Sequence, residues 1–312
     1  MAGQLWSAGS GFMATPTLSE ELRNSVQPLS RFAQFCDVEV AIGKNAGETY
    51  TWNVYGDTAV AGSETGIDEN QKMPETTFPV SQGSITITEF GNSVPYSGKY
   101  DNLSEHPVRE IIQKTLKNDA AKTLDKAAHA QFDDSLLTMY GTSDTAATLA
   151  EDGTFAGAAR VMKLAHIKII ADTMQERNIP VYDGEHYMAI MRPSTLRPVL
   201  DELEGIHQYT DAGWVRIMNG EKGRYEGIRF VTQTNIASKG YGAGDAAYFF
   251  GADTITEAIS CPLELRGKIP DDYGRGKGIA WYALEQFGIT HNDQTNAETK
   301  AQARVLRWGG AS

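Results

Sequence analysis

The sequence has little cysteine and no long hydrophobic run. Its two cysteines, Cys36 and Cys261, are far apart and outside any C-x-x-C spacing, so they form neither a disulfide framework nor a zinc motif. Nowhere do about 18 apolar residues occur together, the length that a membrane-spanning helix needs. The first residues, MAGQLWSAGSGFMATP, have neither the basic region nor the apolar stretch of an export signal. We therefore expect no membrane partner and no export.

Basic residues are also scarce. The 312 residues include 28 Lys and Arg against 40 Asp and Glu, a formal net charge of -12. The field of the whole molecule therefore repels polyanions, which disfavours bulk binding of DNA or RNA. The hydrophobic content is nevertheless sufficient for one large domain or two ordinary ones.

Motifs of catalysis and cofactor binding are missing as well. The glycine-rich stretch DYGRGKG, at 272–278, resembles a phosphate-binding loop, but it leads into the alternating strand pattern IAWYAL and not into a helix. We expect its glycines to form a tight turn that presents Arg275 and Lys277 to solvent or to a neighbouring subunit. None of the six histidines has zinc-hydrolase spacing, and no G-x-S-x-G elbow occurs. The sequence predicts no catalytic residue, no cofactor and no metal site.

Two segments with period-two alternation predict strands, TYTWNVY at 49–55 and SITITEF at 84–90. The roughly thirty residues between them have no apolar period, and a compact domain rarely holds so long a loop without a function for it. The loop carries five acidic residues against one basic residue, Lys72. We expect a long β-arm that leaves its own body and packs on a neighbouring copy. The candidate inter-subunit contacts on this arm are Trp52, Tyr55, Lys72 and Phe78.

A long amphipathic helix is the strongest local prediction, over about 104–138, with Ser104 as its N-cap. Apolar residues recur every fourth position: Val108, Ile112, Leu116, Ala120, Leu124, Ala128, Phe132 and Leu136. Steps of four residues overshoot a helical turn of 3.6, so the apolar stripe winds around the helix. The helix must therefore contact different partners at its two ends.

The same helix holds the one concentration of basic residues. Three acidic residues, Glu110, Asp119 and Asp125, lie on the segment with them, so we interpret this set as a solvated face with balanced charge. The alternative is weak contact with a nucleic acid backbone on the inside of a container. The residues that would face DNA in that case are Lys114, Lys117, Lys122 and Lys126, next to Arg109.

Helix and strand patterns alternate in the rest of the chain. We expect an apolar helix over 158–174, a buried strand over 186–191 followed by a helix, and strands over 228–232, 247–250 and 254–260. Segments 279–290 and 301–308 predict a returning pair of strands joined by the polar loop HNDQTNAETK. A soluble α/β enzyme with a site scattered over 150–270 stays an alternative, because catalytic triads assemble from distant residues.

This order of parts resembles the major capsid proteins of tailed bacteriophages with the Hong Kong 97-type fold. Within that group the chain is similar to the family typified by the coliphage N-four capsid protein, on the stretches HYMAIMRP (186–193) and GRYEGIRFVT (223–232). The resemblance implies an α+β fold of five parts. These are an N-terminal arm (1–45), an E-loop β-hairpin (46–103), a P-domain with a spine helix (104–149), an A-domain (150–270) and P-domain return strands (271–312).

The resemblance also implies a function. Copies would form hexamers and pentamers that close an icosahedral virion shell around double-stranded DNA, after synthesis in the cytoplasm of the host bacterium. Implied partners are a scaffolding protein, which we expect to be a separate chain, a portal protein and, as an open point, a decoration protein. Some relatives join the hairpin to a neighbour through a lysine–asparagine cross-link, for which Lys72 is the lysine available here. An encapsulin-type shell around protein cargo shares the fold and stays an alternative.

Overall fold

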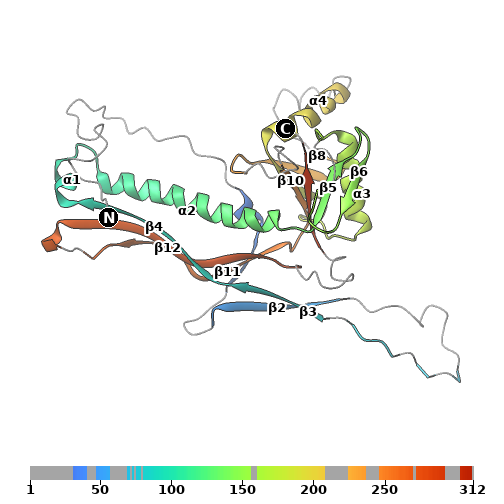
Figure 1. Cartoon of the computed structure of the whole chain (residues 1–312), viewed down its shortest axis with the longest axis horizontal. Coiled ribbons are helices and arrows are strands. Elements are labelled where there is room, and N and C mark those ends of the chain that lie inside the picture. The colour runs from blue at the N-terminus through green and yellow to red at the C-terminus, as the bar shows by residue number, and fades with distance from the viewer. Residues whose placement is uncertain are drawn as a thin grey trace.

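The computed structural model describes residues 31–40, 47–56, 69–70, 72–73, 75–78, 80–155, 160–207, 224–236, 246–269, 272–291 and 303–310. Most of the predicted arm, the middle of the hairpin loop and the polar loop before the last strand lie outside these ranges. The described chain is elongated (Figure 1), with a long helix on a narrow sheet, a body at one end and a projecting hairpin. No helix among the described residues is both long and apolar enough to cross a membrane.

The secondary structure mixes helices and strands along the whole chain. The helices are η1 (Phe32–Phe35), α1 (Gly98–Leu103), α2 (Val108–Asp133), α3 (Leu164–Glu176), α4 (Pro193–His207) and η2 (Asp272–Gly274). The strands are β1 (Asp37–Val40), β2 (Thr49–Tyr55), β3 (Val80–Thr86), β4 (Thr88–Ser97), β5 (Leu137–Gly141), β6 (Ala147–Ala150), β7 (Tyr187–Met191), β8 (Arg224–Tyr225), β9 (Ile228–Thr232), β10 (Ala246–Phe250), β11 (Ile255–Gly267), β12 (Gly276–Ile289) and β13 (Val305–Gly309).

A four-stranded sheet lies under α2, in the order β1-β11-β12-β4. Side chains alternate between the two faces of a strand, so every second residue of β12 points the same way. Three such residues, Ile279, Trp281 and Ala283, are buried with α2 residues in one hydrophobic cluster. The glycine-rich stretch therefore opens a strand, as its sequence context predicts.

The winding stripe of α2 is confirmed. Val108, Ile112, Leu116 and Ala120 pack with β12 and β4, whereas Ala128 and Phe132 pack against the other sheet of the molecule. The helix of 26 residues is about 39 Å long at a rise of 1.5 Å per residue. One rod thus joins two hydrophobic cores.

The predicted ends of this helix are wrong. Ser104 terminates the short helix α1, and α2 starts at Val108 after Pro107, an N-cap residue without a capping side chain. The helix ends at Asp133, and strand β5 begins at Leu137. Apolar spacing alone continues through Leu136 and so overshoots this boundary.

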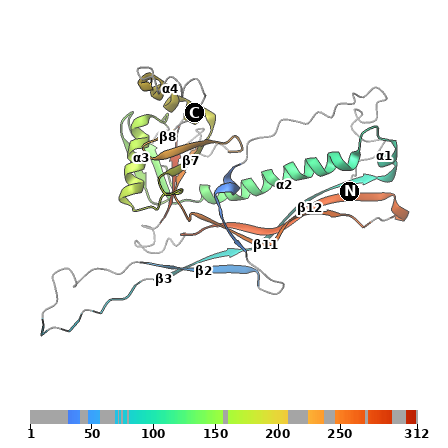
Figure 2. The same ribbon diagram turned by 180° about the vertical axis from the view of Figure 1, so that it is seen from behind.

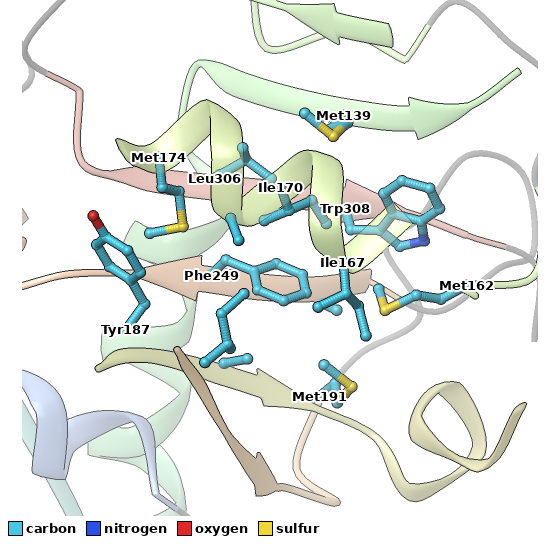
Figure 3. Close-up of a cluster of buried hydrophobic side chains, with 14 of the residues drawn as sticks. Met139, Met162, Ile167, Ile170, Met174, Tyr187, Met191, Phe249, Leu306 and Trp308 are labelled. Carbon is cyan, nitrogen blue, oxygen red and sulfur yellow. The ribbon is translucent and has the colours of Figure 1, made fainter. Parts of the chain in front are cut away.

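A seven-stranded sheet, in the order β6-β5-β13-β10-β7-β9-β8, forms the body at one end. Its central strand β10 is buried on both faces. Helices α3 and α4 cover one face, where Phe249, Leu306 and Trp308 meet Ile167 and Ile170 (Figure 3). The end of α2 covers the other face, together with Phe32 from η1.

Strand partners differ from the sequence prediction at three places. Strands β12 and β13 do not form a pair: β12 lies between β11 and β4, while β13 joins the seven-stranded sheet beside β5 and β10. The predicted strand over 84–90 is two strands that meet at Ile87, one pairing with β2 and the other with β12. Strand β11 runs to Gly267 and so extends beyond the predicted 254–260. Period-two alternation identifies a strand and leaves its partner open.

The apolar helix predicted over 158–174 starts later, at Leu164. Residues 158 and 159 lie outside the described ranges, and 161–163 belong to neither a helix nor a strand. The other predicted elements of the body are confirmed, since 187–191 and 228–232 are adjacent parallel strands. The stretch HYMAIMRP therefore spans β7 and the start of α4.

One buried carboxylate ties α2 to two other parts of the chain. Asp125 is 2% exposed and accepts three hydrogen bonds. The donors are the backbone N–H of Phe32 at 2.7 Å, the Gln233 amide at 2.6 Å and the Asn235 amide at 2.9 Å. Hydrogen bonds to a carboxylate are among the stronger ones in proteins, and the low dielectric of a buried site strengthens them further. The carboxylate thus holds η1 and the segment after β9 against the helix.

Replacing this carboxylate tests its role. Asp125→Ala leaves three donors without their acceptor, at about 1–3 kcal/mol for each buried donor, so we expect the free energy of unfolding to fall by roughly 3 kcal/mol or more. Urea unfolding measures the change. Lys117→Ala, an exposed substitution on the same helix, is the control and should stay within about 0.5 kcal/mol. Equal stability of the two variants would contradict the assignment.

Candidate interaction surfaces

The root of the β2–β3 hairpin is fixed to its own chain. Ile85 is buried against β12, where a side chain at Gly288 would overlap it. The Trp52 ring lies over Gly83, where a Cβ atom would also overlap, and its indole N–H donates to the carbonyl oxygen of Thr290 at 2.9 Å. Trp52, predicted as a contact with a neighbour, therefore anchors the hairpin within the subunit.

The outer end of the hairpin is apolar and uncovered. Tyr55 is 65% exposed and Phe78 is 54% exposed, and their ring centroids are 6.1 Å apart. Val80, paired with Tyr55 in the ladder, is exposed as well. Figures 1 and 2 show β2 and β3 extending away from both sheets. Exposed apolar clusters of this kind mark interaction sites.

Lys72 lies in the same loop region and is exposed. It forms an ion pair with Glu75, three residues further along. Its role in a cross-link with a neighbour stays a prediction.

The turn between β11 and β12 is a second exposed apolar region. Ile269 is 87% exposed, and Tyr273, Leu263 and Leu265 are exposed near it. This turn lies at the end of the molecule opposite the outer end of the hairpin (Figure 1). A copy thus carries two different apolar patches, as contacts between unlike surfaces of identical subunits require.

The two basic residues predicted at this turn behave differently. Arg275 is exposed and pairs with Asp272 at 3.4 Å. Lys277 forms an ion pair with Asp101 of α1 at 2.7 Å, and this pair raises the pKa of the lysine. Lys277 therefore holds β12 to α1 in its own chain, and Arg275 remains available to a neighbour.

The predicted charge balance on α2 is wrong. Asp119 turns towards the sheet and accepts hydrogen bonds from the Trp281 indole N–H and the Asn92 amide, both at 2.9 Å. Asp125 is buried, so Glu110 is the exposed acid that remains from the predicted set. Three of the predicted DNA-facing lysines are exposed and Lys122 is half-buried. The solvent side of the helix is therefore strongly basic.

Groups with nucleophilic or acid–base potential are engaged in packing. Burial raises the pKa of the Cys36 thiol, which keeps it protonated and unreactive. Burial also raises the pKa of Tyr248, whose hydroxyl contacts both Asp133 and His129. No cluster of three His, Cys, Asp or Glu side chains suited to a metal ion occurs among the described residues. Tyr248 thus joins β10 to Asp133 and His129 of α2, and Cys36 is buried in the same hydrophobic cluster.

A buried acid lies close to the hairpin root. Glu285 of β12 is paired with Thr88 of β4, one residue after the point where β3 ends and β4 follows. Burial raises the pKa of Glu285 to about 7, and the charge of Glu257 on β11 adds to the effect. Burial also raises the pKa of Glu257 itself. The sheet beneath α2 thus contains two acids whose pKa is raised by burial.

This arrangement predicts a pH-dependent stability. The pKa of Glu285 is higher in the folded chain, so above about pH 4.5 the unfolded state loses this proton first and folding becomes less favourable as the pH rises to about 7. Glu285→Gln removes the titration. We expect the unfolding free energy of the variant, relative to wild type, to increase between pH 4.5 and 8 in urea titrations. A constant difference over this range would contradict the raised pKa.

Comparison with known proteins agrees with this geometry. No protein-family model and no curated protein sequence matches the chain. Solved structures do: the capsid of cyanophage Pam1 is 13% identical, with a TM-score of 0.68 over 96% of this chain and 97% of that one. The capsid of Helicobacter pylori bacteriophage KHP30 (12%, TM-score 0.68, 96% of each) and that of Ralstonia phage GP4 (16%, TM-score 0.64, 96% of each) also match.

The chain has the fold of a tailed-phage capsid protein. This is the Hong Kong 97-type α+β fold that the order of elements predicts. The match spans nearly the whole length of both chains, so the hairpin, the helix and the body belong to one fold. Closer kinship with the N-four family stays a prediction.

Sequence reasoning misses two features, the exposed apolar residues of the β11–β12 turn and the burial of Asp125. The exposed apolar residues at the β11–β12 turn, Leu263, Leu265 and Ile269, sit in a segment without a clear period, and only the length of β11 reveals them. The charge pattern predicts a surface position for Asp125, whereas its place next to Leu124 of the apolar stripe is the signal for its burial.

Proposed function

We propose that this chain is the structural subunit of an icosahedral viral capsid, assembled from hexamers and pentamers around double-stranded DNA. The observation that carries the proposal is the hairpin, whose root is locked to β12 while its outer end exposes Tyr55 and Phe78. An exposed aromatic pair at the end of an anchored arm marks a surface for interaction with another molecule. The two rings become buried when the hairpin lies on a second copy of the chain.

The two apolar patches explain how one chain can build a closed surface. The hairpin end and the β11–β12 turn lie at opposite ends, so each copy offers one patch and receives another. Heterologous contacts of this kind close into rings when the rotation between copies permits. Rings of six and of five copies then meet at their edges to form the shell.

The remaining partners follow from the same proposal. A separate scaffolding protein and a portal protein would act during assembly in the cytoplasm of the host bacterium, and a decoration protein would bind the outer surface. The domain names P-domain and A-domain would apply to the four-stranded sheet with α2 and to the seven-stranded body. The matching structures are capsids, which favours a viral shell over an encapsulin or a soluble enzyme.

Assembly of the purified protein tests the proposal. Electron microscopy of the wild-type chain should show closed particles, and size-exclusion chromatography should separate them from free subunits. Tyr55→Ser with Phe78→Ser removes the apolar end of the hairpin, so we expect at least a tenfold loss of particles with unchanged circular dichroism. Each anchor should contribute roughly 1–3 kcal/mol to the contact.

A matched control lies on the same strand. Thr51 and Asn53 are exposed polar residues of β2, and Thr51→Ser with Asn53→Ser should leave particle yield unchanged. If the wild-type protein forms no particles under any assembly condition, or if both double variants assemble equally well, the proposed role of the hairpin is wrong.

A further inference from the structure

We propose that the solvent face of α2 contacts the phosphate backbone of the DNA that the shell encloses. The inference rests on the proposed function, and it assigns one surface of the subunit to the inner wall. Three observations carry it: the register of the lysines on the helix, the direction in which the neighbouring acids point, and the side of the sheet from which the hairpin leaves.

The lysines follow the winding of the buried stripe on the opposite side of the helix. Lys114, Lys122 and Lys126 each lie two residues after a stripe position, at 112, 120 and 124. Two residues turn an α-helix by about 200°, so these lysines stay opposite the core as the stripe rotates. Lys114 and Lys126 are about 18 Å apart along the axis at 1.5 Å per residue. At about 100° per residue, Lys126 lies roughly 120° around the helix from Lys114, so the row winds along the exposed surface of the rod together with the stripe.

Few acidic side chains lie on the exposed side of α2 beside the row, where Glu110, four residues before Lys114, is the exposed acid. Asp119 is bonded to Trp281 and Asn92, and Asp125 to the three donors from η1 and the segment after β9. Within the described part of the chain, none of the four lysines forms an ion pair with a carboxylate. In a chain with a net charge of -12, exposed basic side chains therefore outnumber exposed acidic ones along the outer side of α2. Such a face fits a polyanion.

The geometry of the hairpin favours DNA over an acidic segment of a second copy. The hairpin root packs on Gly288 and Thr290, whereas α2 packs on Ile279 and Trp281, which point to the other side of β12. The hairpin therefore leaves from the face of the sheet opposite α2, as Figures 1 and 2 show. Copies joined side by side through their hairpins leave the α2 side of the sheet on one wall of the shell.

Duplex DNA matches the spacing and chemistry of this row. One strand carries a phosphate about every 3.4 Å along the axis, so 18 Å of duplex presents roughly ten phosphates on its two strands. Lysine ammonium groups without fixed partners make mobile, sequence-independent contacts of this type. The net negative charge of the subunit keeps the contact weak, which suits a genome that must move during packing and release.

The test compares two double variants with the same loss of charge. Lys114→Gln with Lys126→Gln removes two exposed lysines of the row. Lys168→Gln with Arg197→Gln removes two exposed basic residues from α3 and α4 in the seven-stranded body. Binding of the full-length, unassembled subunit to a short fluorescent DNA duplex is measured by anisotropy at several salt concentrations. A third variant, Lys114→Arg with Lys126→Arg, keeps the charge.

Each phosphate contact contributes about 0.9 to the slope of log affinity against log salt concentration. We expect the α2 double glutamine variant to reduce this slope by about 2, and the arginine variant and the body variant to keep the wild-type slope. No measurable binding by the wild type, or equal loss in both glutamine variants, would overturn the inference, since the effect would then be absent or due to net charge alone.

Electron microscopy of the same variants separates this inference from the proposed function. Particles from the α2 glutamine variant with a reduced salt slope support a DNA-facing wall. Loss of particles with an unchanged slope would overturn it and assign the lysine row to a protein partner. Absence of particles from the wild type would refute the shell itself, whatever the binding slope shows.

Discussion

The winding apolar stripe of α2 is the constraint on which the molecule depends. A straight helix with a fixed apolar face can pack on one surface, whereas a stripe with steps of four residues turns as it advances. Leu116 therefore faces the four-stranded sheet and Phe132 faces the seven-stranded sheet. The relative position of the two sheets follows from the amount of rotation between these contacts. Asp125 reinforces the junction with hydrogen bonds in place of apolar contacts.

The hairpin is anchored to its own chain at its root and exposes apolar side chains at its outer end. Its root is specific because Gly83 and Gly288 leave room for a tryptophan ring and an isoleucine side chain that larger residues would exclude. Its outer end has no such partner within the subunit. A flexible arm would lose much conformational entropy on docking, and a fixed root reduces this cost. A single chain therefore folds fully but leaves the apolar side chains at the end of its hairpin exposed.

The packing of α2 against the two sheets also determines where its charged side chains lie. Acidic residues of α2 that lie near the stripe, Asp119 and Asp125, are drawn towards hydrogen-bond donors of the sheets and of η1. The lysines of α2 remain on the outer side of the helix, because burial of an ammonium group without a partner is costly. An acidic protein can thus present a basic face without any excess of basic residues in its sequence.

The sequence by itself determined the period of each element, and through it the order of hairpin, long helix, body and returning strands. It also determined that the helix stripe must rotate, since this follows from spacing alone. Only the tertiary structure decided which strands pair, because alternation marks two faces of a strand and contains no information on its neighbours. Strands β12 and β13 accordingly lie in different sheets. The tertiary structure also decided the direction of Asp119 and Asp125, since the donors that attract them come from segments up to about 160 residues away.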